Sequence, residues 1–253
     1  MKPARRDVIV GLAGLSLATV LANPRLARAA AERLETVTLI TAGGRSVSAA
    51  LAVPASTPAP AVMLVHEWWG LNDQIKSVAA ELGKLGYLVL AIDLYGKVAT
   101  TPDEAKTLMG ALDPKAATDT VASWLRWLKA DKRSTGRVAS IGWCFGGGWA
   151  LNAALAEPVD ATVVYYGNVA KTADELGALR GPVLGHFAEK DQWINHAMVE
   201  GYAAAMKKAG KKLEAHWYDA DHAFANPTGA RYDEADAKLA WQRTLAFLKA
   251  TIG

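Results

Sequence analysis

Short apolar runs alternate with amphipathic segments along most of the 253-residue chain. The apolar runs have the length of strands that are buried on both faces of a sheet. Between them, apolar residues recur every three or four positions, as they do along one side of a helix. Strands are predicted at residues 61–66, 87–92, 137–142, 161–166, 182–187 and 213–218, and helices at 73–84, 102–112, 114–130, 146–156, 194–209 and 232–250. This alternation predicts βαβ units around a mostly parallel, doubly wound sheet.

Two further β-type runs come before this pattern, at residues 34–41 and 46–53. Residues 42–45 join them and include two adjacent glycines, which favour a tight turn between antiparallel strands. The hairpin is therefore predicted to add an antiparallel edge to the sheet. No linker or repeat interrupts the later pattern, so residues 30–253 are predicted to form one α/β domain.

The first 29 residues are predicted to be an export signal peptide. Arg5 and Arg6 precede an apolar run at residues 8–22, which is shorter than the roughly 20 residues that a membrane-spanning helix needs. Residues 27–29, Ala-Arg-Ala, have the small-x-small pattern that precedes a signal-peptidase cut. The paired arginines resemble a twin-arginine signal, which exports folded proteins and indicates the periplasm. An uncleaved N-terminal anchor is the alternative.

Charge and cysteine content narrow the classes of partner. Residues 1–29 hold five basic residues and one acid, so the remaining 23 basic and 24 acidic residues give a net charge of −1. A nucleic-acid partner is not predicted, because no basic excess remains to neutralise phosphates.

Cys144 is the only cysteine, which excludes an intramolecular disulfide. No histidine pair has the spacing of metal ligands, so no metal site is predicted. The oligomeric state stays open.

A candidate nucleophile lies between a predicted strand and a predicted helix, in the sequence Gly142-Trp143-Cys144-Phe145-Gly146. This is the Gly-x-nucleophile-x-Gly pattern of a nucleophile elbow, with cysteine in place of serine. Glycine is needed on both sides because side chains there would collide within the sharp turn. The turn also places the sulfur at a helix N-terminus, where the helix dipole is expected to lower the thiol pKa. A buried structural cysteine is the alternative.

A nucleophile elbow requires an acid and then a histidine, each after a later strand. Asp191 follows the strand predicted at 182–187, and His222 follows the strand predicted at 213–218. Glu189 is an alternative to Asp191. The other histidines lie at a strand end, within a strand or within a helix, and are weaker candidates: His66, His186, His196 and His216.

An oxyanion hole requires two backbone N–H groups, one directly after the nucleophile and one after the third strand. Phe145 and Trp68 are predicted to supply them. Four tryptophans would then crowd the mouth of the pocket, with ordinary core packing as the alternative for each: Trp68, Trp69, Trp143 and Trp193.

In these motifs the chain resembles the dienelactone hydrolase family over nearly all of its length after residue 29. The matching segments are His66-Glu67-Trp68-Trp69-Gly70, Ala91-Ile92-Asp93-Leu94-Tyr95, the elbow, the loop at Asp191, and His222-Ala223-Phe224. The resemblance implies an α/β-hydrolase fold without a cap domain, a Cys-His-Asp triad and no cofactor. It also implies that Glu67 holds the resting thiol and helps to deprotonate it.

The resemblance has two departures, at positions where the family carries arginines that bind the carboxylate of dienelactone. These positions hold Lys97 and Asn226. Lysine is a point charge without the guanidinium fork, and asparagine is uncharged. Dienelactone is therefore not the expected substrate, and the expected substrate is a small, partly aromatic ester or lactone.

The sequence thus predicts a hydrolase that uses Cys144, His222 and Asp191 and passes through a thioester intermediate. Two alternatives stay open. The fold could serve as a non-catalytic small-molecule binding module with an inert cysteine. The same triad could also cleave thioesters or amides.

Overall fold

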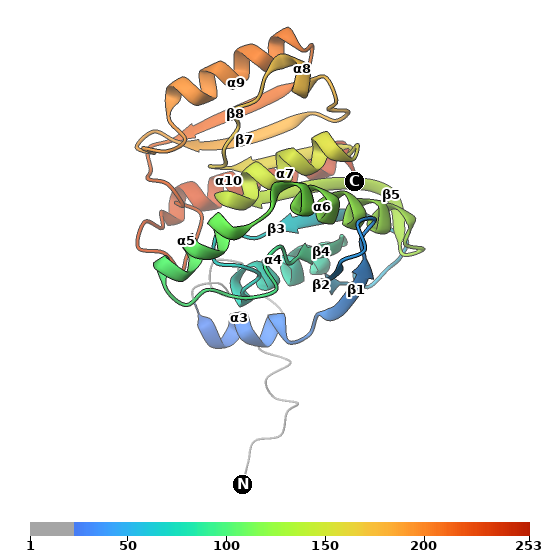
Figure 1. Cartoon of the computed structure of the whole chain (residues 1–253). Helices are drawn as coiled ribbons and strands as arrows, with labels where there is room; N and C mark the ends of the chain where they lie inside the picture. The colour runs from blue at the N-terminus through green and yellow to red at the C-terminus, as the bar shows by residue number, and fades with distance from the viewer. Residues whose placement is uncertain (1–22) are drawn as a thin grey trace.

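The computed structural model describes residues 23–253, which form one eight-stranded sheet with helices on both faces (Figure 1). The apolar core of the predicted signal peptide, residues 8–22, lies outside the described residues. In chain order the elements are α3 (Pro24–Ala31), β1 (Glu35–Ile40), β2 (Ser46–Ala52), β3 (Ala59–Val65), α4 (Asp73–Lys84), β4 (Leu88–Ile92), α5 (Pro102–Ala111), α6 (Pro114–Ala130), β5 (Ser134–Trp143), α7 (Phe145–Ala156), β6 (Ala161–Tyr165), α8 (Ala173–Leu176), β7 (Val183–Ala188), α9 (His196–Lys208), β8 (Leu213–Tyr218) and α10 (Glu234–Thr251).

The strands follow the order β1-β2-β4-β3-β5-β6-β7-β8. The β1–β2 and β2–β4 pairs are antiparallel, and every later pair is parallel. This arrangement confirms the predicted fold class, including the antiparallel hairpin at one edge. Because β3 to β8 are parallel, the loops that follow these strands gather at one edge of the sheet, where ligands bind in open α/β folds.

Both faces of the sheet are buried, which explains why the strands are continuously apolar. Neighbouring residues of β3 point to opposite sides: Met63 packs into the core under α6, α7 and α9, and Leu64 packs into the core under α4 and α10. Both side chains are fully buried. This double core holds the strand ends rigidly and so fixes the loops that follow them.

Two helices were not predicted from the sequence. The first, α8, is a single turn held by a capping box between Thr172 and Glu175, too short for a helical repeat to be visible. The second, α3, covers the predicted cleavage site and packs on α4, where Ser77 Oγ donates a 2.9 Å hydrogen bond to the carbonyl oxygen of Ala27. Between residues 23 and 253, no helix has both the length and the apolar character to cross a membrane.

Candidate active site

Cys144 occupies the turn between β5 and α7 in a strained backbone conformation, with φ 54° and ψ −120°. Positive φ is rare for residues other than glycine and is found at functional turns. A Cβ atom on Gly142 would lie 1.9 Å from the carbonyl oxygen of Gly146, and one on Gly146 would lie 2.3 Å from that of Val65. The predicted need for glycine on both sides of the nucleophile thus has a direct steric cause.

The structure brings together the three residues predicted to form the triad. His222 Nε2 lies 3.1 Å from Cys144 Sγ, and His222 Nδ1 lies 2.6 Å from Asp191 Oδ2. In the chain, Cys144 lies 78 positions and Asp191 lies 31 positions before His222. The imidazole is therefore within hydrogen-bond reach of both the thiol and the carboxylate, as nucleophilic catalysis requires.

Asp191 is fixed by the backbone of its own loop. Its Oδ1 accepts hydrogen bonds from the N–H groups of Trp193 (2.8 Å) and Ile194 (3.0 Å). Burial raises the pKa of Asp191, but the hydrogen bond from His222 and those two amides outweigh it, so its pKa lies below the ordinary value. The carboxyl group is therefore ionised at neutral pH and can orient the imidazole.

The competing acid and histidines are engaged elsewhere. Glu189 pairs with His196 at 2.5 Å rather than with His222. His66 and His186 are fully buried, and both ring nitrogens of each have partners, as expected for core histidines. His216 pairs with Glu214 at 2.6 Å.

The Cys144 thiol is not activated at rest, which corrects the expectation of a lowered pKa. Burial, followed by the negative charges of Glu67 and Asp191, raises the pKa of Cys144 to about 12. The N–H of Phe145, at the start of α7, opposes this rise without cancelling it. Desolvation of the thiolate outweighs the helix terminus here, so the thiol needs a base to become nucleophilic.

Glu67 lies beside the triad, but its carboxylate forms hydrogen bonds with residues other than Cys144. Its Oε2 accepts a 2.5 Å hydrogen bond from the side-chain amide of Asn226, and its Oε1 accepts one of 3.4 Å from the Tyr166 hydroxyl. Burial raises the pKa of Glu67 despite these contacts. The role that the resemblance implied, holding the thiol, is not the arrangement seen here, where the thiol contacts His222.

The two amides expected to form an oxyanion hole follow neighbouring strands of the sheet. Phe145 is the first residue of α7, and Trp68 follows the end of β3, next to β5 in the sheet. Within residues 23–253, no backbone acceptor outside the helices and strands takes a hydrogen bond from either N–H, and the Phe145 N–H faces the sulfur of Cys144, whose pKa it lowers. The positions of these two amides beside the thiol are those that an oxyanion hole requires.

The tryptophans divide between the site and the core. Trp193 is 59% exposed and lies edge-on to the His222 ring at 5.2 Å. Trp68 and Trp69 are half-buried and pack edge-on against each other. Trp143, predicted at the pocket mouth, was placed wrongly, since it is 5% exposed and stacks on Tyr165 within the core.

The two positions that depart from the family pattern are both already paired. Lys97 is exposed and forms a 2.5 Å ion pair with Glu104, and Asn226 is buried with its amide on Glu67. The sequence did not point to Arg231, whose guanidinium lies 5.4 Å from the centre of the Trp193 ring. No sequence signal marks this contact, because a loop folded back over Trp193 creates it.

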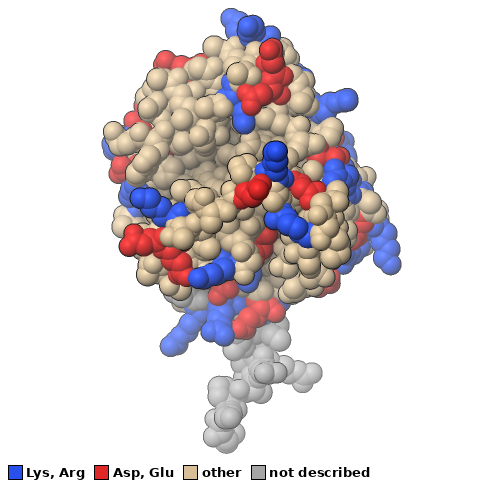
Figure 2. All heavy atoms as spheres, viewed as in Figure 1, with Lys and Arg blue, Asp and Glu red and all other residues tan. Residues whose placement is uncertain are grey.

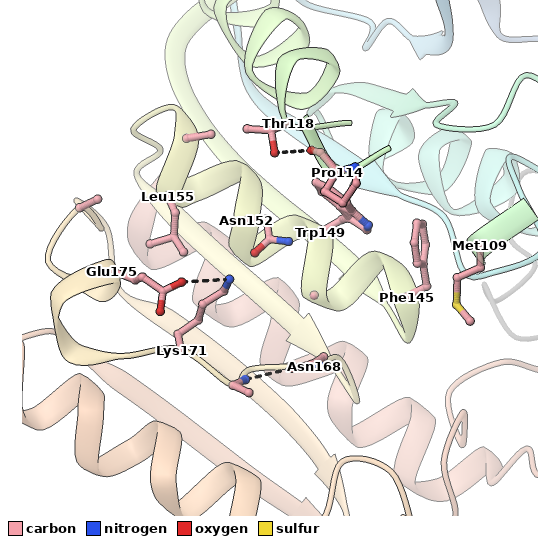
Figure 3. Close-up of a pocket in the computed structure, with 14 residues that line it drawn as sticks. Met109, Pro114, Thr118, Phe145, Trp149, Asn152, Leu155, Asn168, Lys171 and Glu175 are labelled. Carbon is pink, nitrogen blue, oxygen red and sulfur yellow. Dashed lines mark hydrogen bonds and ion pairs between the residues drawn. The ribbon is translucent and has the colours of Figure 1, made fainter. Parts of the chain in front are cut away.

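A groove of about 850 Å³ begins at Phe145 and follows α7 away from the triad (Figure 3). Its apolar walls include Met109, Trp149 and Leu155, and its rim carries the ion pair of Lys171 with Glu175. Figure 2 shows this face hollowed, with few charges inside the hollow. Among residues 23–253, no three His, Cys, Asp or Glu side chains converge as metal ligands would.

Comparison with known proteins adds an independent finding. Residues 47–252 match the family model described as "Dienelactone hydrolase family". The carboxymethylenebutenolidase of Pseudomonas putida is 28% identical, with 81% of this chain and 92% of that protein covered. A solved chain from Klebsiella pneumoniae is 28% identical with a TM-score of 0.73, covering 84% of this chain and 97% of the other. A dienelactone hydrolase-like promiscuous phosphotriesterase from metagenomic libraries, at 23% identity, shares the fold with a TM-score of 0.78 over 87% of this chain and 99% of the other.

Proposed function

The chain belongs to the dienelactone hydrolase family, and from this premise we propose that it cleaves small esters or lactones with Cys144, His222 and Asp191. The observation that carries the proposal is the unbroken contact from Asp191 through His222 to Cys144, with distances of 2.6 and 3.1 Å. A binding module would not need its one cysteine within reach of an imidazole that is itself held by a buried carboxylate.

The first half of the reaction forms a thioester. Sγ of Cys144 attacks the carbonyl carbon while its proton passes to Nε2 of His222, and the carbonyl π electrons move onto oxygen. The resulting oxyanion accepts hydrogen bonds from the N–H groups of Phe145 and Trp68. When the tetrahedral intermediate collapses, the C–O bond breaks and His222 returns the proton to the departing alkoxide.

The second half releases the acid. A water molecule gives a proton to His222 and attacks the thioester carbonyl, and the C–S bond then breaks as His222 returns the proton to sulfur. Asp191 keeps Nδ1 of His222 protonated throughout and stabilises the imidazolium that forms in each half. The raised pKa of Cys144 makes this base essential, because little thiolate is present before substrate binds.

The surroundings of the triad favour a small ester with an aromatic part over dienelactone itself. Lys97 is engaged by Glu104, and Asn226 is uncharged, so neither provides the guanidinium that would clamp a carboxylate. The Trp193 ring beside His222 is 59% exposed and, with the Arg231 guanidinium over one face, still offers aromatic surface to an aryl group.

The test uses the purified full-length chain with p-nitrophenyl acetate, dihydrocoumarin and dienelactone, beside Cys144→Ala and Cys144→Ser. Wild type should hydrolyse the two aryl substrates faster than dienelactone, and Cys144→Ala should lose at least about 10³-fold in kcat. Both variants are close to cysteine in size, and their Tm values verify folding. Wild-type rates in Cys144→Ala, or no turnover of any substrate, would contradict the proposal.

The same assay separates ester cleavage from the cleavage of thioesters and amides. Acetylthiocholine and p-nitroacetanilide serve as the thioester and amide substrates. Higher kcat/KM on either of them than on the aryl esters would reassign the leaving group without changing the triad.

We also propose that the chain is exported and cut after Ala29, on the strength of Arg5, Arg6 and the apolar run that follows. The packing of α3 on α4 means that the cut would fall within a helix that contacts the folded domain. Expression of the full chain in a bacterial host should yield periplasmic protein that begins at Ala30. Replacing both arginines with lysine should keep the protein in the cytoplasm, and unprocessed cytoplasmic protein from the wild-type chain would contradict export.

A further inference from the structure

Tyr95 lies three residues beyond the end of β4, and its buried hydroxyl group has no hydrogen-bond partner among residues 23–253. Its backbone is well anchored, since its N–H donates a 2.9 Å hydrogen bond to Oδ1 of Asp93. A buried hydroxyl without a partner costs folding free energy, and such groups in native proteins usually have a specific reason. A ligand oxygen that arrives only during the reaction is one such reason.

The sheet order places Tyr95 on one particular side of the nucleophile. Asp191 and His222 follow β7 and β8, on the far side of β5. Tyr95 follows β4, which lies next to β3 on the opposite side, and Trp68 follows β3 itself. Since the base comes from one side and the amide of Trp68 from the other, Tyr95 belongs to the oxyanion side.

Aromatic contacts tie Tyr95 to both segments of the oxyanion hole. Its ring centre lies 4.8 Å from that of His66 and 5.4 Å from that of Phe145. His66 also holds the backbone just before Tyr95, because its Nε2 accepts a 3.1 Å hydrogen bond from the N–H of Leu94. The ring of Tyr95 is thus held between the chain that leads to Trp68 and the residue that follows Cys144.

We propose that the hydroxyl of Tyr95 is a further catalytic group, which donates a hydrogen bond to the carbonyl oxygen of the substrate as Cys144 attacks. The inference rests on the proposed function. In this step the S–C bond forms, the carbonyl π electrons move onto oxygen, and the thiol proton passes to His222, while the O–H bond of Tyr95 stays intact. The hydroxyl then gains a partner that no residue between 23 and 253 supplies.

The protonation state of Tyr95 suits a donor. Burial, followed by the negative charge of Cys144, raises the pKa of Tyr95 well above its ordinary value. The hydroxyl therefore keeps its proton at neutral pH and can donate it to a hydrogen bond.

Tyr95→Phe tests the proposal because it removes only the hydroxyl. We expect kcat on p-nitrophenyl acetate to fall roughly 10²-fold, as for the loss of one oxyanion donor, with KM nearly unchanged. The affinity for a trifluoromethyl ketone, which forms an oxyanion on attack by Cys144, should fall in parallel. Tm should stay the same or rise, because residues 23–253 give this hydroxyl no hydrogen bond to lose.

Tyr202→Phe is the matched control, since Tyr202 also has a buried hydroxyl that no residue of the described chain contacts by a hydrogen bond, but lies in α9, away from the triad. It should keep the kcat and ketone affinity of wild type. Wild-type kcat in Tyr95→Phe would overturn the proposal. A fall in kcat accompanied by a fall in Tm of several degrees would also overturn it, because the loss would then reflect damage to the fold.

Cys144→Ala, run in the same assay, separates the two levels of the argument. An inactive Cys144→Ala beside a fully active Tyr95→Phe would overturn the role of Tyr95 alone. A fully active Cys144→Ala would remove the proposed function and, with it, the step assigned to Tyr95.

Discussion

The side-chain amide of Asn226 donates a 2.5 Å hydrogen bond to Oε2 of Glu67, joining the loop after β8 to the loop after β3. Both side chains are buried, and asparagine brings no charge to neutralise the carboxylate. Burial raises the pKa of Glu67, and the amide of Asn226 only partly offsets this effect. The folded protein therefore holds a proton on Glu67 more tightly than the unfolded chain does.

This difference makes the stability that Glu67 contributes depend on pH. A raised pKa in the folded state contributes stability that is fully present below the unfolded pKa and is lost as the pH rises through the folded pKa. Glu67→Gln keeps the shape and an acceptor for Asn226 but carries no charge to bury. We expect its Tm to exceed that of wild type at pH 7–8, with the gap closing toward pH 4. In a chain of this size, a difference of about 1 kcal/mol in the free energy of unfolding shifts Tm by roughly 2–4 °C.

The measurement is thermal unfolding of both proteins between pH 4 and pH 8. Glu200→Gln is the control, because Glu200 is exposed on α9 and forms no ion pair within residues 23–253. Its Tm should follow that of wild type at every pH. A constant difference between Glu67→Gln and wild type across the range would show that ionisation of Glu67 is not the cause.

The raised pKa of Cys144 predicts how the free thiol reacts with alkylating reagents. Because the pKa is about 12, the thiolate is scarce at pH 7, and its fraction grows about tenfold for each pH unit. The rate of alkylation by iodoacetamide should therefore rise about tenfold per unit from pH 7 to pH 10, without a plateau. Mass spectrometry of quenched samples measures the rate at the single cysteine.

His222→Ala is the informative comparison for alkylation. Burial is the main cause of the raised pKa, so the steep rise with pH should persist without the imidazole. A plateau at pH 7–8 in wild type that disappears in His222→Ala would instead reveal a resting thiolate–imidazolium pair, and the prediction would be wrong.

The sequence predicted the fold, and which residues come together around Cys144, more completely than it predicted the contacts that surround them. Continuous apolar runs predicted the buried strands because burial on both faces removes any alternation, and the chain order of an elbow pointed to Asp191 and His222. The pairing of Asn226 with Glu67 and the position of Arg231 over Trp193 depend on how distant loops fold back, which no local pattern records.

Two of the corrected expectations, those for Trp143 and for the pKa of Cys144, share a physical cause. Trp143 and the thiol of Cys144 were interpreted from their place beside an elbow, but burial decided both outcomes. Trp143 is the last residue of β5, and its ring points into the core. The helix terminus favours a thiolate only where desolvation is weaker than it is at this site.

Asp191→Asn tests which acid orients the histidine. An asparagine amide facing Nδ1 of His222 would favour the wrong imidazole tautomer while leaving the backbone of the loop in place. We expect kcat to fall by about 10²–10⁴-fold with little change in KM. Steady-state kinetics on p-nitrophenyl acetate measure the loss.

Glu189→Gln is the matched variant for that experiment, because Glu189 lies two residues earlier and pairs with His196 instead. Its kcat should stay within a few-fold of wild type. A larger loss in Glu189→Gln than in Asp191→Asn would transfer the role of the acid to Glu189.

Gly146→Ala tests the steric basis of the elbow. The added Cβ would lie 2.3 Å from the carbonyl oxygen of Val65 and 2.4 Å from that of His66, both of them backbone atoms at the end of a buried strand. Helix α7 would have to move away from β3, so we expect Tm to fall by several degrees and kcat by at least about tenfold.

Gly201→Ala is the control variant within α9, where a Cβ would meet nothing within 4 Å. Since alanine is the better helix former by about 1 kcal/mol, Gly201→Ala should raise Tm and leave kcat unchanged. If Gly146→Ala kept the Tm and kcat of wild type, the close approach of α7 to β3 would not be what holds Cys144 in place.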